Sequence, residues 1–373
     1  MLAAPTGRAA KRLSELCRRE AKTIHRLLEA GYRGDESYTV FARNKENPIE
    51  ADVVILDEVS MIDITLMQAL LEALRPGTRL ILVGDADQLP PVGPGNFLRD
   101  CIGSERIHTV ELNEIFRQAQ QSAIVRNAHA INHGEMPVSG GRDGDFFIMK
   151  KHGAQDVIAT VVELCQTRLP KFYGYKPAQI QVLTPSRRQN AGTQQLNRML
   201  QEALNPASEF KPEKRHGDTI FRLGDKVMQV RNNYDIVWEK EDDPDEVGSG
   251  MFNGDVGEII GISIPNESML IRFDDRIAHY SFDMLGELEL AYAMTVHKAQ
   301  GSEFDAVVLA LPNGIGRRLL TRNILYTAIT RAKKLLVIVG DPHVIETMVA
   351  VNTRNKRFSA LRTRLIREGD AEE

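Results

Sequence analysis

Continuous apolar runs alternate with helical segments along most of this chain. The runs VVIL at 53–56, FDAVVLAL at 304–311 and KLLVIVGD at 334–341 lack the polar–apolar alternation of a half-exposed strand. Strands of this kind are buried on both faces, which requires helices above and below a parallel sheet. The sequence therefore predicts an α/β protein with doubly covered parallel sheets.

Further segments fit the same alternation. The run RLILVGD at 79–85 predicts a short strand, and QIQVLTP at 179–185 precedes a long helix expected from about 187 to 204. A helix is also expected at 62–74, with Asp63 as its N-cap, and another at 321–332. This order is typical of parallel strands connected by helices.

Two segments depart from this alternation. Residues 31–50 combine β-forming residues with a polar centre and predict a short exposed hairpin. Residues 215–285 contain short β-like runs separated by turn residues, as in a small barrel, with the acidic stretch WEKEDDPDEV at 238–247 inside them. A chain of 373 residues has room for two or three domains.

Charge is unevenly placed along the chain. The net charge of −4 argues weakly against a nucleic-acid-binding protein. However, residues 1–33 carry eight Lys or Arg against three Asp or Glu, and residues 312–368 carry twelve against three. These basic segments either line a groove for a polyanion or form solvated helix faces, and charge alone does not separate the two.

The cysteines and the apolar segments indicate a cytoplasmic location. Cys17, Cys101 and Cys165 lie far apart without a Cys-x-x-Cys pair, which predicts neither a disulfide framework nor a zinc site and fits a reducing compartment. No apolar run has the length of a membrane span, and the first residues lack the core of a signal peptide.

Two adjacent carboxylates follow the strand at 53–56. Asp57 and Glu58 stand where strand ends face the ligand crevice of an open α/β sheet. Magnesium on a nucleotide needs a carboxylate, and hydrolysis needs a second one to orient the attacking water. An Asp-Glu pair after a strand is also common without any function, so the pair requires support from other residues.

Further candidates stand after other predicted strands. Gln88, in VGDADQLPPVGPGNF at 83–97, is a neutral group that can sense a γ-phosphate. Arg117 and Arg331 are candidates for arginine fingers that stabilise a transferring phosphate. The alternatives are an exposed Gln in a surface turn and surface or salt-bridged arginines.

The stretch TVHKAQGSEFDAVVL at 295–309 is the most informative one. It brings Thr295, His297, Lys298, Gln300 and Glu303 into a glycine turn before a buried strand. A single histidine is usually structural, but this density of polar groups indicates a site. Zinc is not expected, because no second His or Cys stands at ligand spacing.

A phosphate-binding loop is the expected companion of such residues. It would end in Gly-Lys-Ser or Gly-Lys-Thr and wrap the phosphates of a nucleotide. None of the 28 glycines of this chain is followed by lysine.

An ordered series of motifs resembles the superfamily 1 DNA helicases, in particular their RecD-like branch. The series covers nearly the whole chain, and its order is more specific than any single motif. The motifs are APTGRAAKRL, TIHRLL, VVILDEVSM, VGDADQLPPVGPG, EIFRQ, TVHKAQGSEFD and YTAITRAKK.

The resemblance implies an ATP- and Mg²⁺-dependent motor and assigns roles in it. Asp57 corresponds to the magnesium carboxylate, Glu58 to the general base, and Gln88 to the residue that couples the γ-phosphate to domain closure. Arg117 and Arg331 correspond to arginine fingers. Nucleotide and DNA are linked by three residues, namely Gln300, Gly301 and Glu303.

The resemblance also implies a path for single-stranded DNA. Phosphate contacts and aromatic stacking are the expected binding interactions. In the first domain the matching positions are Pro5, Thr6, Arg8, Thr23 and His25, with Asn96 and Phe97 as further candidates, and in the second domain they are Thr295 and His297.

The implied fold class is α/β, with two RecA-like P-loop NTPase domains, the first incomplete, and an inserted SH3-like β-barrel. We expect the first motor domain at 1–112, with the hairpin at 31–50 as a pin that splits duplex DNA. The second motor domain is expected at 113–214 and 286–368, the barrel at 215–285 and a tail at 369–373. The family carries its Gly-Lys-Thr loop before APTGRAA, so we expect the chain to be a fragment of a longer helicase.

The leading interpretation is a 5′→3′ DNA helicase that acts on single strands and on junctions with duplex, and whose 373-residue piece is inactive as an ATPase alone. The polarity is implied by the resemblance only. A second interpretation is a non-catalytic DNA-binding or subunit-interaction module of a recombination or repair complex. A third is a helicase subunit that works only with partner chains, and no separate acidic cluster predicts a nuclease site.

Overall fold

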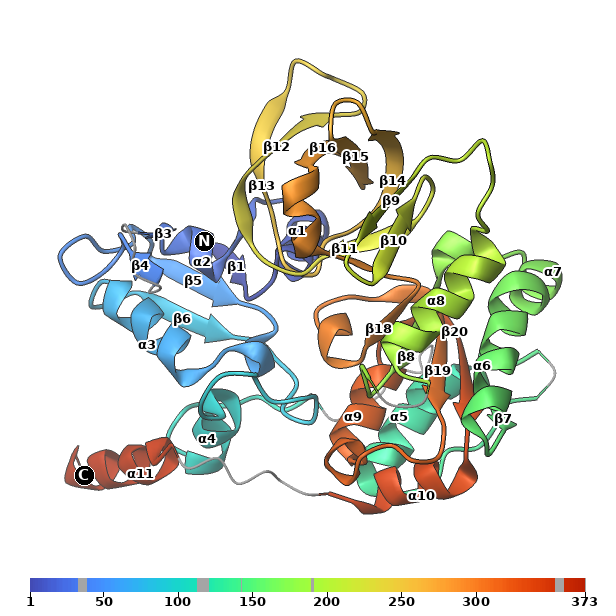
Figure 1. Ribbon diagram of the computed structural model, residues 1–373. Helices are drawn as coiled ribbons and strands as arrows, with labels where there is room; N and C mark the ends of the chain where they lie inside the picture. The colour runs from blue at the N-terminus through green and yellow to red at the C-terminus, as the bar shows by residue number, and fades with distance from the viewer. Residues whose placement is uncertain (33–38, 113–120, 142, 189–190, 353–358, 373) are drawn as a thin grey trace. The chain divides into compact units, whose positions relative to one another are not determined.

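A computed structural model describes residues 1–32, 39–112, 121–141, 143–188, 191–352 and 359–372. The chain divides into two compact units (Figure 1). The first unit contains residues 1–116 together with residues 353–373, and the second contains residues 117–352. A parallel sheet forms the centre of each unit, as the apolar runs predict.

The first unit is built on a four-stranded parallel sheet in the order β2-β1-β5-β6. Leu2 pairs with Ala21 on one side and with Ile55 on the other. Buried residues of this sheet and of the helix at 64–73 form one core. The strands are β1 Leu2–Ala4, β2 Ala21–Thr23, β5 Val53–Leu56 and β6 Arg79–Leu82.

The helices of the first unit begin at polar caps. The predicted N-cap Asp63 accepts a hydrogen bond from the Leu66 amide at 2.8 Å. This bond satisfies one of the free amides at the start of the helix. The helices are α1 Gly7–Cys17, α2 Ile24–Leu27, the 3₁₀ turn η1 Val59–Met61, α3 Ile64–Ala73 and α4 Phe97–Ser104.

The C-terminal helix α11, Leu361–Glu372, belongs to the first unit. We expected residues 286–368 in the second motor domain and 369–373 as a tail, whereas residues 353–373 group with the first unit. Leu361 and Leu365 lie on one face of the helix and pack against the core of the first unit. Ser359, just before the helix, donates a hydrogen bond to Asp100 on α4. Apolar burial therefore joins the end of the chain to its beginning.

The two strands of the expected hairpin are present. β3, Ala30–Tyr32, pairs antiparallel with β4, Thr39–Phe41. Residues 33–38 between them lie outside the described residues.

The second unit contains a five-stranded parallel sheet in the order β18-β8-β19-β20-β7. In β19, Ala306, Val308 and Ala310 face one core cluster, while the alternate residues are buried on the other face. Helices therefore cover both faces, as the continuous apolar runs require. The strands are β7 Phe146–Lys150, β8 Ile180–Thr184, β18 Ala293–Thr295, β19 Phe304–Leu311 and β20 Ala332–Gly340.

Two groups of helices enclose this sheet (Figure 1). One core cluster joins α6 Ala154–Glu163, α7 Leu169–Tyr173 and α8 Thr193–Leu204 to the sheet. The others are α5 Ala123–His133, α9 Arg322–Ile329 and α10 Pro342–Ala350. Helix α8 begins later than the expected residue 187, because Ala191 has a positive φ of 52° and Gly192 is the N-cap.

An antiparallel seven-stranded sheet interrupts the second motor fold, in the order β13-β12-β16-β15-β14-β11-β17. It extends beyond the expected 215–285, since its last strand is β17 Leu288–Leu290. The hairpin of β9 Glu213–His216 and β10 Thr219–Arg222 precedes it. The other strands are β11 Lys226–Gln229, β12 Asn233–Lys240, β13 Val247–Met251, β14 Val256–Ser263, β15 Ser268–Phe273 and β16 Arg276–Ser281.

A buried carboxylate joins this β-sheet domain to α8. Asp225 is fully buried, and burial raises the pKa of its carboxyl group while hydrogen-bond donors oppose the shift. It accepts hydrogen bonds from Gln201 on α8 at 2.6 Å and from Asn205, the C-cap of α8, at 2.7 Å. The Tyr292 hydroxyl and the Arg222 amide donate to it at 2.9 and 2.7 Å. Four donors satisfy this buried charge, as a low-polarity interior requires.

Candidate nucleotide and single-strand sites

Asp57 and Glu58 follow the last residue of β5, at the carboxyl end of the first sheet. Asp57 donates its amide to the Ala3 carbonyl at 3.0 Å, and its Oδ1 accepts the Glu58 amide at 2.8 Å. Glu58 has a left-handed backbone, with φ 53° and ψ 40°. Such a conformation is uncommon outside glycine and concentrates at functional turns. The turn thus presents two half-buried carboxylates side by side.

The loop after β6 is fixed against this turn. The Val59 amide donates to the Val83 carbonyl at 3.0 Å. A Cβ atom at Gly84 would lie 3.1 Å from the amide nitrogens of Val59 and Ser60, so a glycine is needed for this close approach. Gln88, further along the loop, is half-buried and donates to Asp85 at 3.2 Å. The structure therefore holds the two carboxylates and the Gln88 loop at the same edge of the sheet.

The donor set at this edge fits magnesium on a nucleotide. Asp57 offers a hard carboxylate oxygen, and Mg²⁺ is usually held by one or two carboxylates together with phosphate oxygens and water. Within the described ranges, no group of three or more His, Cys, Asp or Glu is arranged to hold a metal by itself. Asp57 would thus be a ligand that needs the nucleotide to complete the site.

Thr6 and Thr23 lie next to each other at the same carboxyl edge. Thr6 caps α1 and accepts the Ala9 amide at 3.3 Å, while Thr23 caps α2 and accepts the Arg26 amide at 3.2 Å. The pairing of Ala4 with Thr23 brings the two caps together. Pro5 and Arg8 flank the first cap and are half-buried.

His25 lies two residues after the Thr23 cap. Burial lowers the pKa of its imidazole, and the nearby Asp63 carboxylate opposes this shift only in part. The ring centroid lies 6.1 Å from that of Phe41 on β4. A lowered pKa keeps the imidazole neutral at pH 7, available for hydrogen bonding and stacking.

The candidates Asn96 and Phe97 differ from the other positions. Phe97 is 8% exposed and packs in the core of the first unit. An aromatic ring in this position cannot stack on a base without leaving the core. Asn96 precedes α4 and makes no side-chain capping bond.

Thr295 and His297 repeat this arrangement in the second unit. Thr295 is the last residue of β18, an edge strand, and its hydroxyl accepts the Lys298 amide at 3.3 Å. Burial lowers the pKa of His297. Each unit therefore ends an edge strand of its parallel sheet with a threonine whose hydroxyl accepts the amide three residues later. A half-buried histidine with a lowered pKa follows each threonine after one residue.

Ser186 is a neighbour of this turn that sequence reasoning missed. The Val296 amide donates to the carbonyl of Thr184, which places the residues after β8 beside the turn. The Ser186 hydroxyl is buried and has no hydrogen-bond partner within the described residues. Only its position after a strand marks it in the sequence.

Gln300, Gly301, Glu303 and Arg331 come together before the first residues of β19 and β20. The Arg331 guanidinium is 4% exposed and donates to the carbonyls of Ser302 and Thr327, both at 3.2 Å. Gly301 has a φ of 69°, which favours glycine. The Glu303 carboxylate lies 3.7 Å from the Lys333 ammonium.

The segment 296–303 connects the two ends of the second sheet. Thr295 pairs with Thr184 at the carboxyl end, whereas Phe304 pairs with Ala332 at the amino end. Eight residues therefore lead from the carboxyl end of the sheet to its amino end. Arg117, the other candidate finger, lies outside the described residues.

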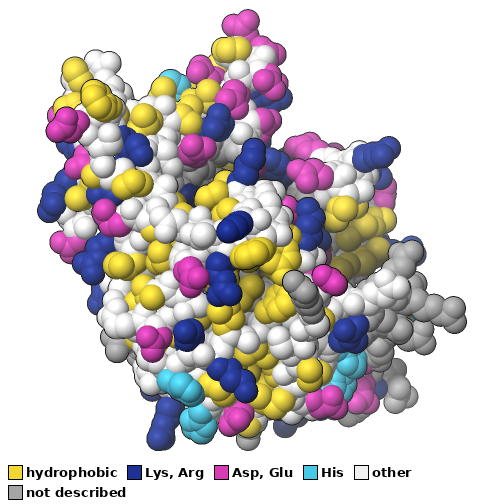
Figure 2. Space-filling view, turned by 90° about the vertical axis from the view of Figure 1, so that its right-hand side faces the viewer, with side chains coloured by type: hydrophobic (Ala, Val, Ile, Leu, Met, Phe, Trp, Pro, Cys, Tyr) yellow, Lys and Arg dark blue, Asp and Glu magenta, His cyan; other side chains and the backbone are white. Residues whose placement is uncertain are grey.

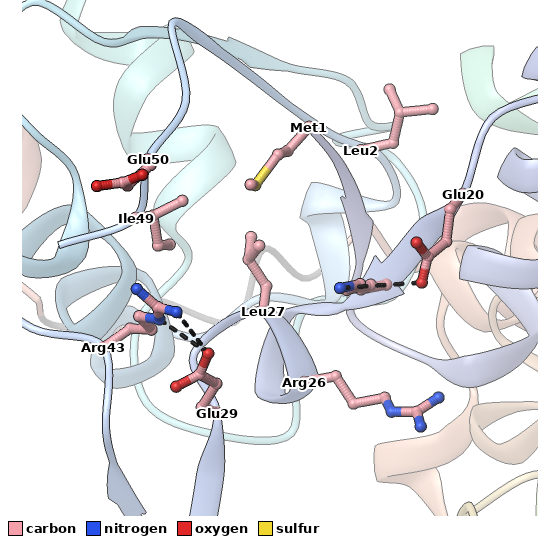
Figure 3. A pocket seen from close by; sticks show the side chains of 10 residues that line it. Met1, Leu2, Glu20, Arg26, Leu27, Glu29, Arg43, Ile49 and Glu50 are labelled. Carbon is pink, nitrogen blue, oxygen red and sulfur yellow. Dashed lines mark hydrogen bonds and ion pairs between the residues drawn. The ribbon is translucent and has the colours of Figure 1, made fainter. Parts of the chain in front are cut away.

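Two other surface features differ from these sites. A pocket of about 440 Å³ lies at the amino ends of β1 and β2, at the opposite end of the sheet from Asp57 (Figure 3). On the face of the second unit that carries α7, Lys and Arg side chains are interspersed with Asp and Glu (Figure 2). That face therefore lacks the uniform positive charge of a phosphate-binding track.

Three family models match the chain in succession. Residues 1–149 match an AAA domain, residues 196–273 match the SH3 domain of ATP-dependent RecD-like DNA helicases, and residues 290–339 match the C-terminal domain of UvrD-like helicases. The order agrees with the two motor folds and the inserted β domain. The chain is 34% identical over 364 residues to the ATP-dependent RecD2 DNA helicase of Deinococcus radiodurans. The chain belongs to the RecD-like helicase family.

This RecD-like chain spans only part of its relatives. The alignment with the Deinococcus protein covers 98% of the chain and 46% of that protein. With the RecBCD enzyme subunit RecD of Mycobacterium tuberculosis, the identity is 31% over 394 residues, which covers 98% of the chain and 64% of that protein.

A solved structure supports the fold of the RecD-like chain. The Pif1 helicase from Bacteroides in complex with ADP-AlF3 and single-stranded DNA matches with a TM-score of 0.53 at 18% identity. The match covers 100% of this chain and 87% of that one. The predicted α/β class with RecA-type motor folds and an SH3-like domain is confirmed.

Proposed function

We propose that this chain forms the motor part of an ATP-dependent DNA helicase that moves along single-stranded DNA. The observation that carries the proposal is the repeated Thr-x-His turn, Thr23 with His25 and Thr295 with His297, at an edge strand of each parallel sheet. Two equivalent contacts on two units are what a motor needs to hold one strand alternately.

The chemistry of these turns suits a nucleic-acid backbone. A threonine hydroxyl that accepts an amide proton still has its own hydrogen to donate to a phosphate oxygen. The helix N-termini at Thr6 and Thr23 add partial positive charge, and Arg8 adds a full one. Pro5 completes this contact surface, and the neutral histidines supply hydrogen bonds or stacking surfaces.

ATP and Mg²⁺ are the proposed cofactors. They supply the phosphoanhydride bond and the positive charge that stabilises the transferred phosphate. Asp57 would bind the Mg²⁺ ion, and Glu58 would act as the general base that accepts the proton of the attacking water. Gln88 is the proposed sensor of the γ-phosphate.

Arg331 and Arg117 are proposed to stabilise the transferring phosphate, and the first has its geometry fixed by Ser302 and Thr327. The segment with Gln300, Gly301 and Glu303 transmits nucleotide state to Thr295, because it connects the two ends of one sheet. Arg117 remains a prediction from the motif EIFRQ.

The hairpin of β3 and β4 is the proposed pin that separates duplex at a junction, and the SH3-like domain is proposed to grip one strand. The polarity 5′→3′ is part of the proposal and rests on the family. Relatives named as subunits of the RecBCD enzyme support, as a proposal, association with recombination or repair partners.

A cytoplasmic location is proposed. Its support is that Cys17, Cys101 and Cys165 are free thiols, two of them buried, as in a reducing compartment. None of the helices in the described part of the chain has the length and apolarity needed to span a bilayer.

A binding experiment tests the strand contacts without any nucleotide. The purified 373-residue chain should bind a fluorescent single-stranded oligonucleotide, and Thr23→Val and Thr295→Val should each weaken it. A matched control is Thr109→Val, because the Thr109 hydroxyl bonds only a nearby carbonyl within the described contacts. Binding that is unaffected by both variants would overturn the proposed strand path.

An ATPase experiment tests the motor. The 373-residue chain alone should show little turnover, whereas a protein that joins it to a Gly-Lys-Thr loop should hydrolyse ATP faster with single-stranded DNA. Strand-stimulated turnover by the chain alone would overturn the assignment of the phosphate loop to another segment. Absence of turnover in the joined protein, with strand binding retained, would instead favour a binding module.

A further inference from the structure

The base of the hairpin is held by more than its two short strands. Strands of three residues each are too short to fix a direction on their own. Backbone pairing continues beyond them, since the amides of Ala42 and Arg43 donate to the carbonyls of Glu29 and Leu28 at 3.3 and 3.1 Å. Leu28 is fully buried, and Phe41 packs against the same core.

An ion pair closes this base. The Arg43 guanidinium donates from Nε and Nη2 to the same oxygen of Glu29, at 2.9 and 2.7 Å. Its third nitrogen lies 3.3 Å from the Asn47 side-chain oxygen and 3.4 Å from the Pro48 carbonyl. Figure 3 shows the Glu29 and Arg43 side chains directed toward one another beside Leu27 and Ile49.

The two partners flank the hairpin in the sequence. Glu29 immediately precedes β3, and Arg43 follows β4 after one residue. Glu29 also has a positive φ of 52°, so the chain turns sharply where it leaves α2. The side chains are 30% exposed for Arg43 and 49% for Glu29. A planar guanidinium fixed by an acid and two carbonyl-type oxygens has little freedom to rotate.

A second contact joins the hairpin to the proposed strand path. The ring of His25 on α2 lies 6.1 Å from the ring of Phe41, with an interplanar angle of 51°. His25 stands two residues after the Thr23 cap. The end of β4 is thus in contact with the same turn that is proposed to hold the single strand.

We propose that Glu29 and Arg43 form a clamp that fixes the direction of the hairpin, and that His25 and Phe41 align it with the single-strand path. A pin separates base pairs only if it does not yield when the motor pulls DNA against it. The clamp residues are positioning residues, because their described contacts hold the base of the hairpin. The inference rests on the proposed helicase function and adds the residues that make the hairpin effective.

Charge reversal tests the clamp in the 373-residue chain. Glu29→Arg and Arg43→Glu each place like charges together, so the amides of residues 30–32 and 39–41 should exchange hydrogen faster. The double swap should restore part of the protection. The control is the swap of Glu50 and Arg75, an exposed pair at 2.5 Å on the same unit. Equal exchange in all variants would overturn the clamp.

Helicase assays in a protein that joins this chain to a Gly-Lys-Thr loop test the consequence. Either single reversal should lose most unwinding of forked duplex and retain strand-stimulated ATP hydrolysis, and the double swap should regain unwinding. A merely structural role would reduce both activities together. Unwinding by the single variants at the wild-type rate would overturn the clamp alone. A wild-type protein that hydrolyses ATP without unwinding would overturn the helicase proposal and the clamp with it.

Discussion

At the scale of single residues, conformation distinguishes Glu58 from an ordinary surface carboxylate. Its backbone is left-handed, and the turn is held by hydrogen bonds from the Glu58 amide to Asp57 and from the Val59 amide to the Val83 carbonyl. A strained residue persists only where its surroundings determine its conformation. We therefore expect substitution of the Glu58 carboxylate to reduce ATP hydrolysis and to leave the fold of the first unit intact.

Glu58→Gln keeps the size of the side chain and removes the base. In a protein that supplies the phosphate loop, turnover should fall by about 10²–10⁴-fold, as for other general bases, while ATP and DNA affinities are retained. Strand-stimulated phosphate release and equilibrium binding measure the two effects. Glu72→Gln, at an exposed position of α3, is the matched control. Unchanged turnover in Glu58→Gln would place the base elsewhere.

His297 gives a prediction about pH. Burial lowers its pKa, so between that lowered pKa and about 6.5 the unfolded chain binds more protons than the folded chain. The free energy of unfolding should therefore decrease as pH falls through about 6.5, by this group's contribution. His297→Asn should make the decrease shallower in urea unfolding between pH 7.5 and 5.5. Parallel pH dependences for wild type and variant would contradict the prediction.

At the scale of elements, the junction between the β-sheet domain and α8 depends on one carboxylate. Removing Asp225 removes the acceptor of the Tyr292 hydroxyl and of the Arg222 amide. The side-chain amides of Gln201 and Asn205 lose one of two acceptors and keep the carbonyls of Ile220 and Leu223. A buried donor without an acceptor destabilises the folded state by more than a typical hydrogen bond stabilises it. The inserted domain extends to Leu290, beyond the expected residue 285, because β17 pairs with β11.

Asp225→Ala should lower the free energy of unfolding by about 1–3 kcal/mol for each buried donor that is left without an acceptor. Tyr292→Phe removes only the hydroxyl that donates to Asp225. It should therefore lower the free energy of unfolding by about 1 kcal/mol. Denaturant unfolding measures both. Glu258→Gln, at an exposed pair with Arg272, should change stability by less than about 0.5 kcal/mol. A loss for Asp225→Ala as small as this control would contradict the buried network.

At the scale of the whole molecule, the C-terminal helix belongs to the first unit. Helix α11 packs Leu361 and Leu365 against the core that contains α4. The second unit, residues 117–352, lies between α4 and α11 in the sequence. The first unit is therefore made of two segments that are far apart in the chain. Stability of the first unit thus depends on residues more than 250 positions away.

A chain that ends at residue 352 tests this dependence. The two leucines are half-buried, so the first unit should lose about 2 kcal/mol of stability from apolar burial. Hydrogen exchange should increase in α4 and leave the sheet of the second unit unchanged. The control is Leu365→Met in the full chain, which conserves volume and should keep protection in α4. Unchanged protection of α4 in the shortened chain would contradict the packing.

The sequence by itself determined the parallel sheets, the fold class, the inserted β domain and the motif series of the family. These features rest on local periodicity and on short ordered motifs, which act over a few residues. Asp57 with Glu58, and Thr295 with His297, were found in this way. The same local reasoning placed Phe97 on the strand path, because an aromatic residue in a loop motif looks the same whether it is exposed or buried.

Only the tertiary structure decided which distant segments meet. The Glu29–Arg43 clamp, the Asp225 junction and the docking of α11 join residues separated by 14, 20 and 259 positions in their hydrogen bonds. These contacts depend on the whole fold. An apolar face must be covered and a buried charge must be hydrogen-bonded, and the fold decides which distant segment does so. Local pattern therefore specified the elements and the family chemistry, whereas packing specified how each element is held in place.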